Sequence, residues 1–174
     1  ILLLIVAAVL VVASRRRSHG EGLVVEHMNR RFEDTADELK AAIGGKALHK
    51  KAVKARRKER KREDKARAHA ESTKPRVFVL DFKGDLRASA VASLREEVSA
   101  ILDVAKPGEH VLLRLENSGG TVHEHGFAAS QLMRLKQHGV KLLVAVDKVA
   151  ASGGYLMACV ADRLIAAPFA IVGS

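Results

Sequence analysis

Short apolar runs alternate with amphipathic stretches from residue 76 onwards, and this alternation restricts the fold more than any other feature of the chain. Four runs are strand-like, because they are short, rich in Val, Leu and Ile and separated by polar or glycine-containing segments: 77–80, 111–115, 142–146 and 163–166. Between the first three of them, apolar residues recur at the spacing of one helix face. This pattern predicts an α/β fold with mainly parallel strands that are buried on both faces.

Two glycine-containing loops, at 117–121 and 147–154, follow the second and third predicted strands. In open parallel sheets, ligands bind beyond the carboxyl ends of the strands, so both loops lie where a site is expected. Ser152 stands in the second loop, at the start of a predicted helix and before two glycines. Its hydroxyl is a candidate nucleophile, because the glycines let a substrate backbone come close and a helix N-terminus favours developing negative charge.

The backbone N–H groups of the same loops predict a place for a substrate oxyanion. Gly120 in the first loop and Gly153, the residue after the candidate nucleophile, can each supply one hydrogen-bond donor. Either glycine pair alone is typical of an ordinary tight turn. Two such pairs at corresponding strand ends, with a serine in one of them, favour a catalytic site.

The general base that a serine nucleophile needs is not assigned by these motifs. His123 and His125 flank Glu124, but residues two apart do not share a helix face, so an exposed polar helix start is favoured over a base or a metal pair. Lys148 lies four residues before Ser152, yet a solvent-facing lysine is the favoured interpretation. The G-x-S-x-G motif of an α/β-hydrolase is absent from the sequence.

The basic character of the chain, which has a formal net charge of +10, belongs to its N-terminal part. Residues 14–76 hold 20 Lys and Arg against 10 Asp and Glu, whereas residues 77–174 hold 10 of each kind. Residues 46–67 contain twelve basic and three acidic residues, which predicts a charged helix that acts as a spacer or contacts anionic lipid. Nucleic acid is a less favoured partner, because this stretch has no aromatic residue for stacking on bases and no recognised motif.

The first thirteen residues are uninterrupted apolar sequence, and three arginines follow at 15–17. We expect a truncated transmembrane segment at 1–13, since a complete span needs about 20 apolar residues and positive charge flanks its cytoplasmic end. A cleaved signal peptide is the alternative. Residues 14–75 are expected to form a basic helical stalk and linker. One helix of this stalk has an apolar stripe that can pack on a partner helix or lie along the membrane surface: Val25, Met28, Phe32, Ala36, Leu39 and Ile43.

Four segments of residues 76–174 resemble the protease domain of SohB-type inner-membrane peptidases, in the signal peptide peptidase A family: R-V-F-V-L-D-F-K-G, L-R-L-E-N-S-G-G, D-K-V-A-A-S-G-G-Y-L-M-A-C-V-A-D and A-P-F-A-I-V-G-S. The resemblance implies a ClpP/crotonase-like fold and hydrolysis of peptide bonds by a Ser–Lys dyad, with no cofactor or metal. It implies that Ser152 is the nucleophile and that the lysine lies several tens of residues further on, beyond Ser174. The chain is therefore expected to hold the N-terminal part of the protease domain at 76–174 and to be inactive by itself.

The resemblance also implies a single-pass protein of the bacterial inner membrane, with a peptide or membrane-protein substrate and membrane lipid as its neighbour. It suggests a protease domain in the periplasm, whereas the basic flank predicts a cytoplasmic one, so the side of the membrane is left open. A homo-oligomer is left open as well. One departure concerns the first loop, where the family usually has S-P-G-G and this chain has N-S-G-G, with Ser118 in place of the proline.

Two other functions belong to different classes. A non-catalytic membrane scaffold would bind acidic lipid or nucleic acid through its basic helix, with strong salt dependence and an unreactive Ser152. An acyl-CoA enzyme on a crotonase-like fold is the third hypothesis, and its weakness is that the serine motif is unnecessary for that chemistry.

Overall fold

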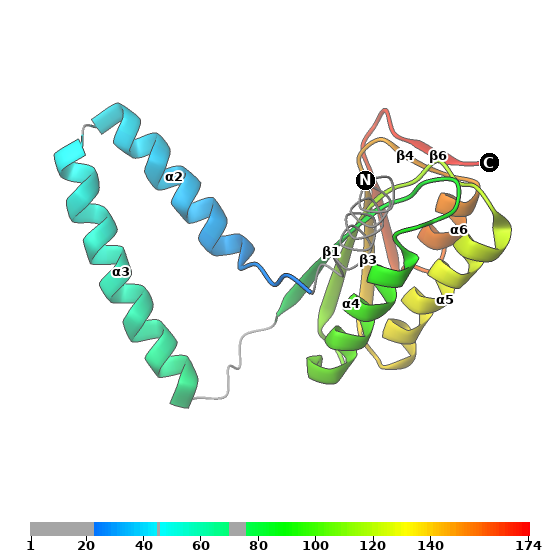
Figure 1. Ribbon diagram of the computed structural model, residues 1–174, viewed down its shortest axis with the longest axis horizontal. Helices are drawn as coiled ribbons and strands as arrows, with labels where there is room; N and C mark the ends of the chain where they lie inside the picture. Colours follow the sequence, from blue (N-terminus) through cyan, green and yellow to red (C-terminus); the bar gives the residue numbers. More distant parts are fainter. Residues whose placement is uncertain (1–22, 45, 70–75) are drawn as a thin grey trace, which may run out of the picture. The chain divides into compact units, whose positions relative to one another are not determined.

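The computed structural model describes residues 23–44, 46–69 and 76–174. The predicted transmembrane segment at 1–13 lies outside the described residues, and within them no helix is both long and apolar enough to cross a membrane. The chain divides between residues 72 and 73 into two compact units (Figure 1). In the described residues the first unit is helical, and the second contains the strands.

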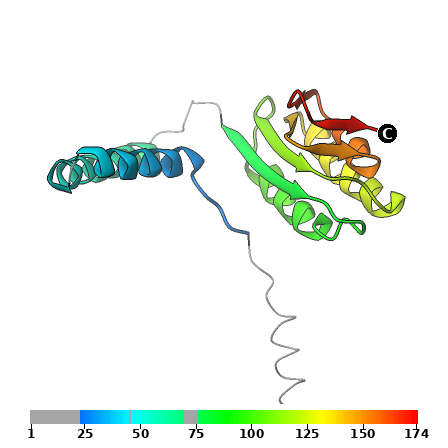
Figure 2. The ribbon, with the colours of Figure 1, turned by 90° about the horizontal axis from the view of Figure 1, so that it is seen from above.

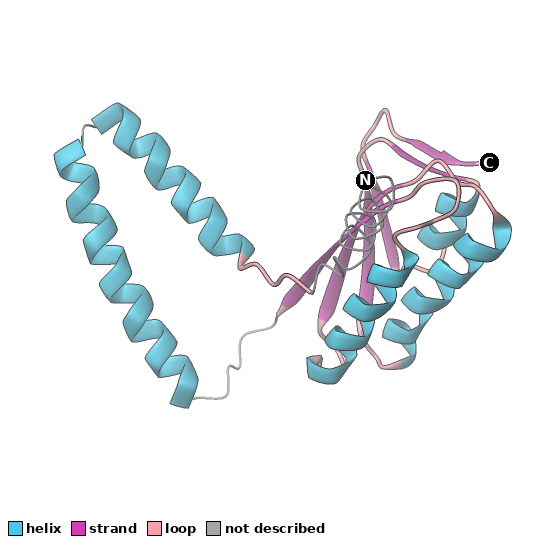
Figure 3. Ribbon diagram, in the orientation of Figure 1, coloured by secondary structure: helices cyan, strands magenta, loops and turns pink. Residues whose placement is uncertain are grey.

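The second unit is built on a four-stranded parallel sheet with the order β1-β2-β3-β5 (Figure 3). Its strands are β1 Val77–Lys83, β2 His110–Glu116, β3 Lys141–Val146 and β5 Arg163–Ala166. All four overlap the strand-like runs of the sequence, so the predicted mixed α/β architecture with parallel strands is confirmed. This arrangement is consistent with the ClpP-like fold that the resemblance implies.

Helices α4 Val91–Val104 and α5 Val122–Gln137 connect the strands and cover one face of the sheet (Figure 2). Every second side chain of β1, β2 and β3 points into the apolar core beneath these helices, because successive residues of a strand face opposite sides. Gly139 follows α5 with a φ of +80°, in the left-handed conformation that ends many helices. The largest fully buried apolar side chains include Phe82, Leu94, Leu113, Leu132, Leu135, Leu142 and Met157.

The opposite face of the sheet is open in the described residues, so the expectation of strands buried on both faces is wrong for this part of the chain. Asp81 on β1 and Arg114 on β2 are exposed neighbours on that face, and all four residues of β5 are exposed. The apolar runs predicted deeper burial because their composition resembles that of a doubly covered sheet. Only the tertiary arrangement decides which faces are covered.

A second, two-stranded parallel sheet lies after the third strand and was not predicted as a pair. It joins β4 Val149–Ala151 to β6 Ile171–Gly173. A short helix, α6 Gly153–Ala158, follows β4 directly, as the helix expected near Ser152. Asn117, one residue past β2, forms a bridge with Ala150, so the end of the large sheet is hydrogen-bonded to the small one.

In the first unit, α2 Met28–Gly44 and α3 Lys46–His69 are joined by ion pairs between acidic and basic side chains. Arg60 on α3 lies 3.0 Å from Glu33 and 2.8 Å from Asp34 on α2. Two further pairs extend this ladder in antiparallel register, Arg56 with Asp37 and Arg30 with Asp64. The carboxylates of α2 therefore neutralise part of the strongly basic α3.

The apolar stripe of α2 is not what contacts α3. Phe32, Leu39 and Ile43 are 60%, 62% and 88% exposed. They lie on the side of α2 that is roughly opposite to the acidic residues of the ladder, since each residue advances about 100° around a helix. The amphipathic helix is therefore confirmed, while its apolar face has no partner among the described residues.

Candidate active site

Ser152 occupies a sharp turn between β4 and α6. Its φ of 49° and ψ of −118° are sparsely populated for a residue with a side chain. Two hydrogen bonds hold the backbone there: the N–H of Ser152 donates to the Ser174 carbonyl at 2.7 Å, and its carbonyl accepts from Leu156 N–H at 3.0 Å. The residue is exposed. Such a strand-to-helix turn resembles the way in which α/β-hydrolases present a nucleophilic serine.

The first glycine loop lies directly against this serine. Gly119 has a φ of +93°, and a Cβ built on it would lie 2.6 Å from the Cβ of Ser152 and 2.9 Å from the Gly153 nitrogen. Only a glycine therefore fits between the two loops. The sequence predicted that the loops occupy neighbouring strand ends, and the structure brings them into van der Waals contact.

The pairing of the two sheets explains why the loops meet. Asn117 N–H donates to the Val149 carbonyl at 2.9 Å, and Ala151 N–H donates to the Asn117 carbonyl at 3.0 Å. Because Asn117 begins the first loop and Ala151 precedes Ser152, these bonds set the separation of the two loops. A Cβ on Gly154 would lie 2.2 Å from the Asn117 carbonyl oxygen, so α6 also approaches the first loop too closely for any residue but glycine at this position.

Gly120 and Gly153 are the predicted oxyanion donors, and their N–H groups have no hydrogen-bond acceptor among the described residues. Gly153 is the first residue of α6, where N–H groups lack acceptors within the helix. The N–H of Gly119, in contrast, donates to Asn117 Oδ1 at 2.8 Å. Of the two glycines of the first loop, Gly120 is thus the one whose donor remains available.

The missing proline of the first loop has a structural substitute. The Asn117 side chain accepts a hydrogen bond from the N–H two residues ahead, which is an Asx-turn. Ser118, at the position of the proline, is exposed. The asparagine at 117, followed by Ser-Gly-Gly, was the sequence signal for this turn.

His125 is buried, and the expectation of an exposed histidine pair at the start of α5 is wrong for this residue. His123 is exposed as expected, whereas the His125 side chain is 0% exposed. The Nδ1 atom of His125 lies 2.8 Å from the Thr121 carbonyl and its Nε2 atom 3.3 Å from Asn117 Oδ1. Residues two apart lie on different faces of a helix, so the exposed face of α5 carries His123 and the buried face carries His125.

Lys148 faces solvent, as expected, and forms an ion pair with Glu116. It is 68% exposed and pairs with Glu116 at 3.4 Å. Glu116 also lies 3.8 Å from Lys83. The described residues therefore give Lys148 an ion-pair role at the surface.

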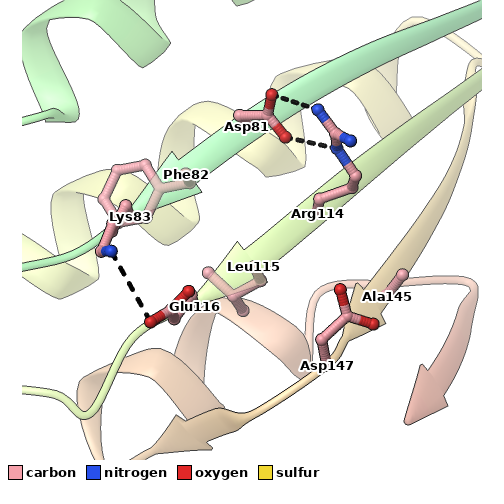
Figure 4. Close-up of a pocket in the computed structure, with 8 residues that line it drawn as sticks. All are labelled: Asp81, Phe82, Lys83, Arg114, Leu115, Glu116, Ala145 and Asp147. Atoms are coloured by element: carbon pink, nitrogen blue, oxygen red, sulfur yellow. Dashed lines mark hydrogen bonds and ion pairs between the residues drawn. The ribbon is translucent and has the colours of Figure 1, made fainter. Parts of the chain in front are cut away.

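A pocket lies on the open face of the sheet (Figure 4). Arg114 donates two hydrogen bonds to the Asp81 carboxylate, which raises the pKa of this guanidinium further. No group of three or more His, Cys, Asp or Glu side chains is placed to hold a metal ion in the residues that the structure describes. The pocket is lined by Asp81, Phe82, Lys83, Arg114, Leu115, Glu116, Ala145 and Asp147, with no predicted site residue among them.

Comparison with known families agrees with the motifs. Residues 1–132 match the model of the peptidase family S49 N-terminal region, and residues 134–174 match the model of peptidase family S49. The chain belongs to peptidase family S49. Within this family it is similar to proteins named SohB.

Two relatives illustrate the SohB similarity. The chain is 69% identical over 98 residues to "Probable protease SohB" of Haemophilus influenzae, a match that covers 56% of this chain and 28% of the relative. It is 63% identical over 103 residues to "Probable protease SohB" of Buchnera aphidicola subsp. Acyrthosiphon pisum, covering 59% of this chain and 31% of the relative. The chain thus spans about a third of the length of these S49 relatives in the matched region.

Proposed function

We propose that the full-length protein carrying this chain is a membrane-anchored serine endopeptidase on a ClpP/crotonase-like domain, with Ser152 as its nucleophile. The observation that carries this proposal is the turn at Ser152, which exposes the residue beside a glycine backbone and two N–H groups that have no acceptor in the described part of the chain. Membership of peptidase family S49 supports it. Anchoring rests on the apolar residues 1–13 and the arginines that follow them.

The proposed reaction is acyl transfer from a peptide or membrane-protein substrate. The Ser152 hydroxyl oxygen attacks the peptide carbonyl, and its proton passes to a lysine beyond Ser174 that is kept neutral by burial. The N–H groups of Gly120 and Gly153 donate hydrogen bonds to the oxyanion of the tetrahedral intermediate. The lysine then protonates the leaving amine, and water hydrolyses the acyl-enzyme. Without that lysine, this chain by itself is expected to be inactive.

Substitution of the serine in the full-length protein tests the proposal. Ser152→Ala should lower peptide hydrolysis by about 10⁴-fold or more and abolish labelling by a fluorophosphonate probe. Ser93→Ala, at an exposed position of α4, and Lys148→Met should keep hydrolysis within about threefold of the wild-type rate, since both lie outside the proposed machinery. Peptide hydrolysis that survives in Ser152→Ala contradicts the assignment of Ser152 as the nucleophile. Loss of hydrolysis in Lys148→Met contradicts the assignment of the general base to a lysine beyond Ser174.

We also propose that α3 contacts anionic lipid headgroups at the inner membrane. The arginines at 56 and 60 pair with carboxylates of α2. Several lysines of α3 are exposed and available for phosphates: Lys50, Lys54, Lys58, Lys61 and Lys65.

Vesicle binding tests this contact while the apolar N-terminal run is held constant. Replacing Lys54, Lys58 and Lys61 by glutamine should weaken binding to phosphatidylserine-containing vesicles several-fold and leave binding to pure phosphatidylcholine vesicles unchanged. Equal binding of the wild-type and the substituted protein to both kinds of vesicle contradicts the proposal. Tighter binding of the wild-type protein to RNA than to phosphatidylserine-containing vesicles contradicts it as well. Lipid binding together with an unreactive Ser152 would favour the non-catalytic scaffold.

A further inference from the structure

Two polar side chains lie fully inside the apolar core next to the glycine loops. The side chain of His125 is 0% exposed and that of Asn117 is 1% exposed. Burying such groups costs free energy unless they are hydrogen-bonded. They meet each other, since His125 Nε2 lies 3.3 Å from Asn117 Oδ1, and Asn117 Nδ2 lies 3.5 Å from the sulfur of Met157 on α6.

The imidazole ring spans the first glycine loop from one end to the other. Its Nε2 atom contacts Asn117, the first residue of the loop, and its Nδ1 atom lies 2.8 Å from the carbonyl of Thr121, the last residue of the loop. Gly119 and Gly120 lie between these two attachment points. The same Asn117 Oδ1 accepts the Gly119 N–H at 2.8 Å, so the ring, the amide and the loop backbone form one hydrogen-bonded unit.

The same ring also supports the second loop. A Cβ on Gly153 would lie 2.4 Å from Cγ and 2.6 Å from Cδ2 of His125, so the Gly153 backbone rests against the imidazole. Helices α5 and α6, which carry His125 and Gly153, lie side by side (Figure 1). One side chain therefore contacts both glycine loops.

We propose that His125, together with Asn117, is a positioning residue that holds the Gly120 and Gly153 N–H groups in place for the oxyanion. This inference rests on the proposed function, because it assigns the ring a task in that site. Donors that are fixed before reaction stabilise developing charge without reorganisation. The ring acts through the two loops, because it contacts their backbone rather than the reacting atoms.

Two substitutions separate the contacts of the ring. Gln places its amide nitrogen near the position of imidazole Nε2, whereas Asn places it near Nδ1. Asn117 Oδ1 and the Thr121 carbonyl are both acceptors, and a neutral imidazole has a single N–H, so it donates to one of them at a time. His125→Gln keeps a donor on the side of Asn117 Oδ1, and His125→Asn keeps one on the side of the Thr121 carbonyl. We expect the contact with Asn117 to matter more, because the Thr121 carbonyl already accepts a backbone hydrogen bond from His125 N–H at 3.2 Å.

The experiment measures kcat and KM for a peptide substrate, fluorophosphonate labelling of Ser152 and the thermal midpoint, all in the full-length protein. His125→Gln should keep kcat within about threefold of wild type. His125→Asn should lower kcat by about 10- to 100-fold with KM within threefold, because oxyanion donors act in the transition state. Both variants should have similar thermal midpoints, which separates positioning from a loss of stability.

A second pair of variants covers the case in which the histidine variants do not fold. Asn117→Asp keeps the accepting oxygens for Gly119 and His125 and should retain kcat within about threefold, whereas Asn117→Leu removes them and should lose kcat as His125→Asn does. Equal kcat values in His125→Gln and His125→Asn, or a loss confined to KM, overturn the inference. A wild-type protein whose Ser152 is not labelled overturns the proposed function itself, so the two failures are distinguishable.

Discussion

Gly119 is the residue on which contact between the two loops depends most directly. A Gly119→Ala substitution should lower labelling and hydrolysis by about 10²-fold, because the new Cβ would lie 2.6 Å from the Cβ of Ser152 and displace one loop. It should also destabilise the fold by roughly 1–3 kcal/mol, since φ is +93° at this position. Rates and urea unfolding of the full-length protein measure both effects.

Gly126 provides the matched control. It lies in α5, and a Cβ there would have no atom within 4 Å. Gly126→Ala should leave the rate unchanged and stabilise the protein by up to about 1 kcal/mol, because alanine is the better helix former. If the two alanine variants have the same rate, the loops do not need the close approach at Gly119.

At the scale of elements, one ion pair fastens the start of β1 to the segment before β2. Arg76 donates two hydrogen bonds to Glu109, at 2.7 and 2.8 Å, and a third at 2.8 Å to the Val104 carbonyl at the end of α4. The Arg76 side chain, with help from the Lys106 N–H, lowers the pKa of Glu109 to about 2. The carboxylate therefore stabilises the fold above its ordinary pKa of 4.5, and this contribution is lost as the pH falls towards 2.

Glu109→Gln should therefore lower the free energy of unfolding at pH 7 by about 0.5–1 kcal/mol, since the pair is partly exposed. The difference from wild type should shrink as the pH falls from 4.5 towards 2. Urea unfolding at several pH values measures it. Glu96→Gln, at an exposed position of α4, is the control. A Glu109→Gln penalty that stays constant down to the lowest pH would show that the carboxylate charge is not responsible.

At the scale of the whole molecule, each of the two units is stabilised by a different kind of internal interaction. Among the described residues, the buried apolar core lies in the second unit, between Leu80 and Ala158, whereas the helices of the first unit meet through an ion-pair ladder. Salt at about 1 M shortens the Debye length to about 3 Å and weakens exposed ion pairs. We expect salt to loosen the first unit and to leave the second unchanged.

Two optical signals can follow the units separately. Tyr155 is the single tyrosine of the chain, which has no tryptophan, so tyrosine fluorescence reports only the second unit. Circular dichroism at 222 nm reports the helices of both. Added salt should shift part of the helical transition to lower temperature while the Tyr155 transition stays in place. Coincident curves at low and high salt would contradict independent units.

The sequence by itself determined the strand-helix alternation, the two loops at the carboxyl ends of β2 and β3, and Ser152 at the start of a helix. These features follow from local periodicity and from glycine positions, which reflect the backbone conformation of each segment. The S49 membership was likewise readable from short motifs, and the family comparison confirmed it.

Only the tertiary structure decided which residues meet. Periodicity identified the apolar face of α2, yet the charged face packs on α3, and the histidines at 123 and 125 looked equivalent until α5 was placed against Gly153. The contact of His125 with Gly153, the approach of Gly119 to Ser152 and the open face of the sheet depend on contacts between segments far apart in the chain. A local pattern indicates that a face can be buried, but the partner that buries it is chosen by packing across the whole unit.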